Sequence, residues 1–215
     1  MDIRNLFDER VMKLWKEFLD EYQISDAQEQ QFSHFLQLLV EWSEKINLTT
    51  ITAPSAIIRY HFQDSLVLST ALDLSTISTV CDVGTGAGFP GIPLAIKYPH
   101  LRVILLEVNH KKIDFLDLVI NKLELENVEI YPRDWRTFLR TTDDVVDLFC
   151  ARASLQPEEL VRVFKPGCRY KNARLVYWAA ADWQPEGKEA DYITKQIPYS
   201  VGSKKRKLVV FERQG

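Results

Sequence analysis

The stretch DVGTGAGFPG, residues 82–91, decides the fold of this chain. It contains four of the eight glycines, and its first two residues complete the short apolar run STVCDV. Glycine is costly to order, and chains use it where the backbone turns tightly or where a ligand comes close. In doubly wound α/β folds such a turn joins the first strand to a helix whose N-terminus offers unpaired N–H groups to a ligand. The stretch therefore predicts a site for a nucleotide-like ligand.

Strands and helices alternate downstream of this turn. Strands are predicted at residues 78–83, 102–107, 127–131, 145–151 and 173–178, with helices between them. This alternation implies a parallel sheet covered by helices on both faces. Two more extended segments, residues 191–201 and 204–213, have no helix between them and predict an antiparallel terminal hairpin. The predicted fold class is therefore α/β, with a Rossmann-like sheet.

The first 75 residues show helical patterns instead. Apolar residues from Val11 to Tyr22 recur at helical spacing, and Ser25 with Gln28 forms a capping box before a second apolar stripe. Another helical segment is predicted over residues 54–72. We expect a helical N-terminal extension over residues 1–75 and one compact α/β domain over residues 76–215.

Charge is distributed unevenly along the chain. Residues 1–150 carry 14 basic and 23 acidic side chains, whereas residues 151–215 carry 13 and 7. The net charge of −3 thus hides a basic C-terminal part. Such a part can meet a polyanion locally, although an unevenly charged, solvated surface gives the same pattern.

Composition also indicates where the chain works. The N-terminus lacks the basic lead and apolar core of a signal peptide, and no apolar run approaches the roughly 18 residues of a membrane span. The three cysteines, Cys81, Cys150 and Cys168, lack C-x-x-C spacing. They predict thiols in a reducing compartment rather than disulfides or metal ligands. We expect a cytoplasmic monomer with no membrane partner and no metal.

The spacing of the glycines distinguishes two cofactors. The dinucleotide fingerprint G-x-G-x-x-G/A, counted from Gly84, requires a small residue where Phe89 stands. The D-x-G-x-G-x-G pattern of S-adenosylmethionine-dependent methyltransferases is formed here by Asp82, Gly84, Gly86 and Gly88. Glu107 ends the second predicted strand, where its carboxylate can accept hydrogen bonds from ribose hydroxyls. We therefore expect S-adenosylmethionine as the cofactor and disfavour a nicotinamide oxidoreductase.

Several longer motifs resemble one methyltransferase family. DVGTGAGFPGIPLAI is preceded by INLTTI and YHFQDSL and followed by LLEVNHKKIDFL and CARA. In this order, from about Trp42 to Leu155, they are similar to the RsmG (GidB) methyltransferases. The resemblance implies a class I S-adenosylmethionine-dependent methyltransferase domain over residues 76–215. It also implies the substrate, one guanine of 16S ribosomal RNA in the small ribosomal subunit (nucleotide 527), methylated at N7.

The same resemblance assigns expected site residues. Gly84, Phe89 and the backbone around Asp134 and Trp135 should line the cofactor site. Arg152 should face the cofactor or the target base. Family members usually carry glutamate where this chain has Trp135, so the indole either stacks on the adenine or marks a divergent paralogue.

A second group of residues is expected near the substrate. His61, Asp64 and Ser65 share one helical face and border the pocket by family resemblance, with a helix-end hydrogen-bond cluster as the alternative. Asn47 is either a pocket residue, as the resemblance implies, or a loop cap. A basic run in the expected hairpin turn comprises Lys204, Lys205, Arg206 and Lys207. This run either contacts RNA phosphates or is solvated.

The expected reaction needs no general base. The N7 atom of guanine carries an in-plane lone pair and no proton, and the sequence offers no evident catalytic dyad. Catalysis would come from aligning nucleophile, methyl group and sulfur, with Arg152 positioning the base. Two other hypotheses stay open, a methyltransferase of a small molecule or protein and a non-catalytic relative that binds RNA.

Overall fold

A seven-stranded sheet forms the centre of the computed structural model, which describes residues 7–46 and 48–214. Its strands are β1 (Thr79–Val83), β2 (Arg102–Leu106), β3 (Val128–Tyr131), β4 (Leu148–Arg152), β5 (Arg174–Ala180), β6 (Ile193–Val201) and β7 (Lys204–Phe211). Their order is β3-β2-β1-β4-β5-β7-β6. Strands β1 to β5 run parallel, and β7 lies antiparallel to β5 and β6. The predicted α/β sheet with an antiparallel terminal hairpin is confirmed.

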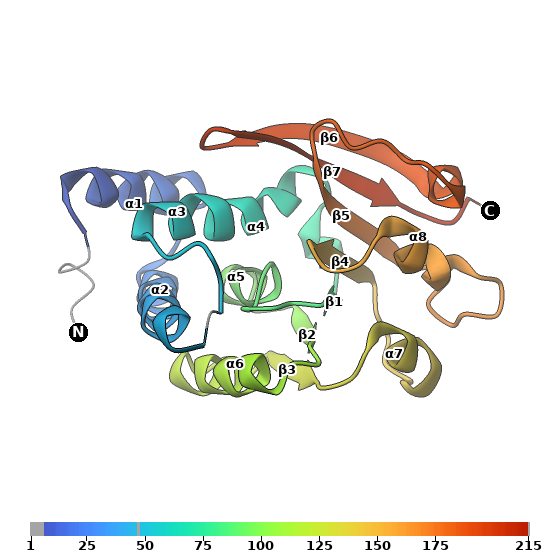
Figure 1. Ribbon diagram of the computed structural model, residues 1–215, viewed down its shortest axis with the longest axis horizontal. Coiled ribbons are helices and arrows are strands. Elements are labelled where there is room, and N and C mark those ends of the chain that lie inside the picture. Colours follow the sequence, from blue (N-terminus) through green and yellow to red (C-terminus); the bar gives the residue numbers. More distant parts are fainter. Residues whose placement is uncertain (1–6, 47, 215) are drawn as a thin grey trace.

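Helices cover both faces of this sheet (Figure 1). One face is packed by α5 (Gly91–Lys97) and α6 (His110–Lys122), and the N-terminal helices α1 (Glu9–Glu21) and α2 (Asp26–Ile46) add to this side. The other face is covered by α7 (Trp135–Thr141), α8 (Pro157–Leu160) and the 3₁₀ turn η5 (Val161–Phe164). The strand order reverses between β1 and β4, which is where open α/β sheets hold ligands, at the carboxyl ends of the strands.

The segment before β1 is helical, as predicted, but it is not one regular helix. It consists of α3 (Pro54–Ile57), the π-helical turn η2 (Ile58–Gln63), α4 (Asp64–Leu66) and the 3₁₀ turns η3 (Val67–Thr70) and η4 (Leu74–Thr76). A last 3₁₀ turn, η6 (Lys188–Tyr192), precedes β6. Figure 1 shows the α3–α4 segment running beneath the terminal hairpin. In the described part of the chain, no helix combines the length and the apolar character that crossing a membrane requires.

The N-terminal helices and the sheet share one hydrophobic core. Phe35 of α2 and His61 of η2 pack on Phe89, which follows the glycine turn, at centroid distances of 5.2 and 4.1 Å. Phe18 and Phe32 lie behind them, fully buried and edge to face. Burying one such side chain stabilises the fold by about 1.5–3 kcal/mol. The N-terminal helices therefore support the loop in which the glycines lie.

Strand β4 begins at Leu148, later than the apolar run from Val145 predicts. Val145 is 75% exposed, so only part of the run reaches the core. The side chain of Asp147 accepts hydrogen bonds from the backbone N–H groups of Ser78 and Thr79, at 2.8 and 2.9 Å. Strand β4 therefore starts directly after Asp147, whose side chain caps the start of β1.

Candidate functional site

The glycine turn between β1 and α5 requires glycine at three positions. Gly84, Gly86 and Gly88 have φ values of +68°, +63° and +94°, which L side chains rarely adopt. A Cβ atom on Gly84 would lie 2.6 Å from Ser154 Cβ, and one on Gly88 would lie 2.6 Å from Ile92 Cγ1. At Gly86 the nearest atom is 3.9 Å away, on Lys112. The outer glycines thus permit close packing, and the middle one leaves open space for a ligand.

Two carboxylates hold the turn. Asp82 is fully buried, and its Oδ2 accepts from Thr85 Oγ1 at 2.6 Å and from the N–H of Gly91 at 2.7 Å. Burial raises the pKa of Asp82 to about 6. Glu107 accepts from the N–H of Gly86 at 3.0 Å through Oε2. Asp82, which the D-x-G-x-G-x-G pattern assigns to cofactor binding, therefore lies behind the turn and is not among the residues that border the two cavities.

Two adjoining cavities open at the carboxyl ends of β1, β2 and β4. One of about 280 Å³, here named the Glu107 cavity, is bordered by Glu107, Asp134 and Trp135. The other, of about 250 Å³, is named the Arg152 cavity after one of the residues that border it. Both are bordered by Gly84, Lys112 and Ala153. Together they reach the size of small-molecule sites, about 300–1,000 Å³.

The Glu107 cavity suits a nucleoside. The Oε1 atom of Glu107 accepts two backbone N–H groups at 2.9 Å, so with the bond from Gly86 three hydrogen bonds are formed. An ionised carboxylate offers about four acceptor positions, which leaves capacity for a ribose hydroxyl. Val108 borders the same cavity and is 58% exposed, an apolar surface that a ligand base can cover.

Asp134 and Trp135 lie at this cavity, as the resemblance implies. Asp134 is the N-cap of α7, and its Oδ1 accepts from the N–H of Thr137 at 2.9 Å. Trp135 is buried, packs edge to face on Phe149 and donates its Nε1–H to the carbonyl of Glu159 at 3.2 Å. The indole is thus fixed by core contacts, and its stacking on an adenine stays a prediction.

Arg152, at the end of β4, borders the second cavity and is tied to the segment before β1. Its Nη1 donates to the carbonyl of Tyr60 at 3.0 Å and to Asp64 Oδ2 at 2.9 Å. Its Nη2 donates to His61 Nδ1 at 3.1 Å, and its guanidinium lies 5.1 Å from the ring centroid of Phe89. The side chain of Arg152 is 10% exposed. Arg152 therefore borders the cavity, as expected, and is also the partner of a buried ion pair with Asp64. Nothing in the sequence indicated this ion pair.

The expected substrate face of His61, Asp64 and Ser65 is divided by the structure. His61 borders the Arg152 cavity, whereas Asp64 is fully buried beneath it. Ser65 Oγ donates to the carbonyl of His61 at 2.6 Å and does not border the cavity. The prediction for Ser65 as a cavity residue is wrong, since this residue is fully buried in α4 and its hydroxyl bonds back to the carbonyl four residues earlier. Asn47 lies outside the described residues.

His61 is neutral. An arginine only donates, so Nδ1 of His61 accepts from Arg152 and the proton sits on Nε2, which donates to Thr49 Oγ1 at 3.2 Å. Burial, then the charges of Arg152 and Lys204, lower the pKa of His61 to about 2. The ring stacks on Phe89 with an interplanar angle of 7°. It contributes a flat apolar face and no acid–base chemistry near neutral pH.

This pKa has a measurable consequence for stability. The unfolded chain protonates His61 near pH 6.5 and the folded chain does not, so stability falls by about 1.4 kcal/mol for each pH unit below 6.5. Between pH 7.5 and 5.0, wild type should lose about 2 kcal/mol more free energy of unfolding than His61→Asn. Chemical denaturation at both pH values measures this difference, with the exposed His34→Asn as the control. Equal losses in wild type and His61→Asn would contradict the buried neutral imidazole.

The basic run near the C-terminus lies on strand β7 and not in a turn. The turn is formed by Gly202 and Ser203. Side chains alternate along a strand, so Lys204 and Arg206 border the Arg152 cavity, while the Nζ of Lys207 lies 5.6 Å from the ring centroid of Trp183. The extended segment predicted from residue 204 is confirmed, and the placing of the basic run in the hairpin turn was wrong, because pairing with β6 extends through the charged residues. Lys205, at the alternate position, is exposed and does not border the cavity.

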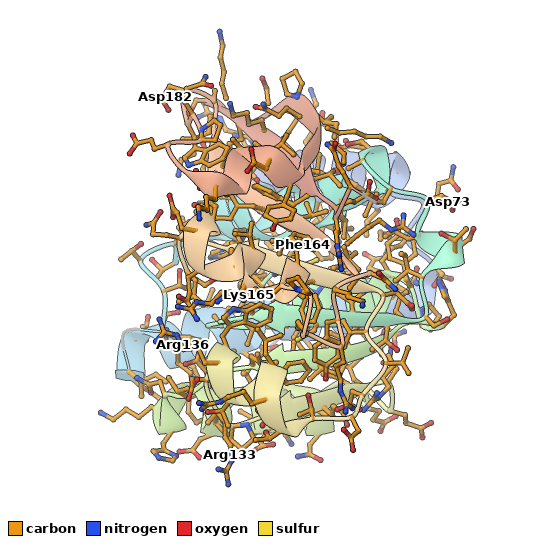
Figure 2. The ribbon with its side chains drawn as sticks, turned by 90° about the vertical axis from the view of Figure 1, so that its right-hand side faces the viewer. Asp73, Arg133, Arg136, Phe164, Lys165 and Asp182 are labelled. Atoms are coloured by element: carbon orange, nitrogen blue, oxygen red, sulfur yellow. The ribbon has the colours of Figure 1, made fainter. Side chains whose placement is uncertain are left out.

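The remaining positive charge of the C-terminal part is spread over other surfaces. Figure 2 shows Lys165 on the face formed by α7 and η5, which also carries Arg136 of α7, a residue of the earlier part of the chain. Arg136 and Arg162 both pair with Glu159, and Arg169 pairs with Asp143. The basic C-terminal part therefore does not form one patch, and its contribution to the site comes from β4 and β7.

The Arg152 cavity is strongly cationic. Its basic lining residues are Lys112, Arg152, Lys204 and Arg206, and its described lining includes no aspartate or glutamate. Lys112 and Tyr60 were not expected at the site. Lys112 carries a signal in the motif LLEVNHKKIDFL, but nothing in the sequence indicates that Tyr60 lies under Lys204, whose Nζ is 4.5 Å from its ring centroid. Within residues 7–46 and 48–214, no group of three or more His, Cys, Asp or Glu is placed to hold a metal ion.

Comparisons with known proteins fit this geometry. The model of the GidB family, described as rRNA small subunit methyltransferase G, matches residues 28–209. The chain belongs to this family. It is 34% identical over 209 residues to ribosomal RNA small subunit methyltransferase G of Staphylococcus saprophyticus, covering 89% of this chain and 84% of the relative. The protein of that name from Bacillus subtilis is 37% identical over 172 residues, covering 78% and 72%. The family resemblance predicted from the motifs is confirmed.

Solved structures of lower identity show the same fold. MtNAS in complex with MTA and tNA has a TM-score of 0.58 at 14% identity, covering 87% of this chain and 74% of that one. The mitomycin 7-O-methyltransferase MmcR has a TM-score of 0.56 at 16% identity, covering 95% and 68%. These similarities confirm the Rossmann-like fold of class I S-adenosylmethionine-dependent methyltransferases.

Proposed function

We propose that this chain is an S-adenosylmethionine-dependent methyltransferase of small-subunit ribosomal RNA, acting at N7 of the guanine numbered 527. The observation that carries the proposal is that a glycine loop with open space over Gly86 adjoins a cavity bordered by four cations. Membership of the GidB family supports ribosomal RNA as the substrate, and the motifs that resemble RsmG support the guanine N7 position.

The cofactor is assigned to the Glu107 cavity and the glycine loop. Gly86, which borders the Arg152 cavity, leaves room for the methionine part. Within the Glu107 cavity, Glu107 accepts from the ribose, and Val108 with Trp135 offers apolar surface to the adenine. When bound, S-adenosylmethionine supplies a methyl group on a positively charged sulfur. The residues of this chain orient that group towards the Arg152 cavity and exclude water around it.

The target base is assigned to the Arg152 cavity. Guanine N7 has a free lone pair, so no side chain needs to remove a proton, and neutral His61 is consistent with this. Arg152 and Arg206 supply donors for the base edge or for phosphate, and Lys112 and Lys204 add charge that attracts a polyanion. A base in a duplex cannot reach such a cavity, so we infer that the target guanine is unstacked when it binds.

Alternation along β7 gives a matched test of the phosphate contacts. Lys204→Ala removes a cation at the cavity, and Lys205→Ala removes the same charge from a side chain that does not border it. Log–log plots of RNA affinity against salt should become shallower by about 0.7–0.9 for Lys204→Ala and stay unchanged for Lys205→Ala. Equal slopes in the two variants would remove Lys204 from the RNA site.

The substrate class is tested by supplying alternatives with the same labelled cofactor. Small ribosomal particles that lack the modification, large particles and free guanosine are each incubated with protein and methyl-labelled S-adenosylmethionine. The proposal expects label in the small particles alone. Label in free guanosine at a comparable rate would instead support a small-molecule methyltransferase.

A further inference from the structure

One buried carboxylate joins parts of the chain that are far apart in sequence. Asp64 of α4 is fully buried, and its Oδ2 accepts from Arg152 Nη1 at 2.9 Å and from Arg206 Nη1 at 2.5 Å. The two arginines stand on β4 and β7, and β5 lies between these strands. No direct strand pairing therefore fixes the distance between the two guanidiniums. Asp64 does so through a single oxygen.

The other groups of Asp64 are also bonded. Tyr199 donates its hydroxyl to Oδ1 at 2.7 Å, and Trp178 donates its Nε1–H to the backbone carbonyl at 2.7 Å. Tyr199 and Arg206 are directly opposite one another in the β6–β7 hairpin. The hairpin thus reaches Asp64 through both of its strands, and the position of Asp64 is fixed from several sides.

The arrangement leaves charge and donors for a ligand. Two guanidiniums share one carboxylate, so one positive charge stays uncompensated in the group. The described bonds use three of the five N–H groups of Arg152, and both arginines border the Arg152 cavity. Guanidinium forks match the geometry of phosphate oxygens, and a pair held at fixed spacing needs little reorganisation on binding.

We propose that Asp64 is a positioning residue, which holds Arg152 and Arg206 as a preformed pair for a phosphodiester of the target nucleotide. The inference rests on the proposed function and adds a part to it. Asp64 itself touches no substrate, because it lies beneath the cavity. Tyr199 is a second positioning residue, because its hydroxyl, on the hairpin, holds the Asp64 carboxylate that in turn holds the two arginines.

Two variants test this role with almost no change in the volume of the buried side chains. Asp64→Asn keeps the shape and removes the charge that the guanidiniums share, and Tyr199→Phe removes only the hydroxyl. Because hydrogen bonds to charged groups are strong, we expect Asp64→Asn to raise the KM for small ribosomal particles about tenfold or more and Tyr199→Phe about threefold. The Kd for S-adenosylmethionine should stay within about twofold of wild type, since the glycine loop is not touched.

The matched control is Tyr170→Phe. Tyr170 is buried, whereas Tyr199 is half-buried, and the hydroxyl of Tyr170 bonds to Thr142 on a loop that borders neither cavity. Active concentrations are set by cofactor titration, so that turnover numbers refer to binding-competent molecules; KM itself does not depend on the inactive fraction. A purely structural role for Asp64 predicts that Tyr199→Phe and Tyr170→Phe both lower the melting temperature and that neither changes the KM for particles.

The outcomes separate this inference from the proposed function. A raised KM for particles in Tyr199→Phe, with an unchanged KM in Tyr170→Phe, supports the positioning role even where Asp64→Asn does not fold. If Tyr199→Phe and folded Asp64→Asn both keep the KM of wild type, this inference is overturned. The proposed function still stands in that case, provided that the wild-type protein methylates the particles. A wild-type protein that methylates no ribosomal particle overturns both.

Discussion

Gly86→Val is expected to abolish binding of S-adenosylmethionine. Gly86 has a φ of +63°, and the space over its Cα is open except for the Lys112 ammonium at 3.9 Å. A valine there would be strained, because β-branched side chains resist positive φ, and it would fill the space assigned to the methionine part of the cofactor. Calorimetric titration should detect no heat at concentrations that saturate wild type.

Gly86→Ala separates the two effects. A single Cβ meets only an ordinary contact, so this variant should show the backbone strain, about 1–2 kcal/mol, with weakened rather than absent binding. Gly167→Val is the control, since a Cβ at Gly167 meets nothing within 4 Å. Wild-type affinity in folded Gly86→Val would show that the cofactor does not lie over the glycine loop. Tight NAD binding without S-adenosylmethionine binding would overturn the cofactor assignment.

Arg152→Ala is expected to lose about a hundredfold or more in turnover, the scale on which misplaced reacting groups slow enzymes. The variant removes the cavity guanidinium nearest the ring of Phe89 and leaves His61 and Asp64 without one of their partners. Removing one partner of a buried ion pair costs about 3–5 kcal/mol, and Arg206 and Tyr199, which stay on Asp64, reduce this loss. Turnover per folded molecule and the free energy of unfolding must therefore be measured together.

Arg152→Lys and Arg169→Ala complete this test. Arg152→Lys keeps the charge but replaces the two guanidinium nitrogens that reach Tyr60, Asp64 and His61 with a single ammonium nitrogen, so turnover should stay low while part of the stability returns. Arg169 is exposed and pairs with Asp143 away from both cavities, and its replacement should leave turnover unchanged. Turnover of folded Arg152→Ala within about tenfold of wild type would make Arg152 purely structural.

Local patterns were sufficient to predict the sheet and the cofactor loop. The DVGTGAGFPG turn after a buried strand requires positive φ at alternate glycines, and the structure has these angles at Gly84, Gly86 and Gly88. Glu107 could be placed because the end of β2 lies beside the end of β1 in a parallel sheet. Such features depend on residues within one strand, turn and helix, which is the range over which periodicity carries information.

The substrate side depends on contacts that no local pattern contains. Asp64, Arg152 and Arg206 come from α4, β4 and β7, and only the assembled sheet brings them to one point. Helical spacing and the family resemblance together placed Asp64 and Ser65 beside His61 at the pocket. In the structure Asp64 is fully buried beneath the cavity, and the hydroxyl of Ser65 bonds to the carbonyl of His61. The basic run Lys204–Lys207 was expected in the hairpin turn, but it lies on β7, where alternation along the strand sends neighbouring cations to opposite faces.

The central claim is tested most directly by finding which base this protein methylates. Small ribosomal particles that lack the modification are incubated with wild-type protein and labelled S-adenosylmethionine, and the RNA is then digested and mapped by mass spectrometry. N7-methylguanine also makes the chain cleavable after reduction and aniline treatment, which locates the base independently. We expect one methyl group, at N7 of guanine 527, and its loss in Arg152→Ala. A methyl group on another base or another atom, or no methyl group from protein that binds S-adenosylmethionine, would contradict it.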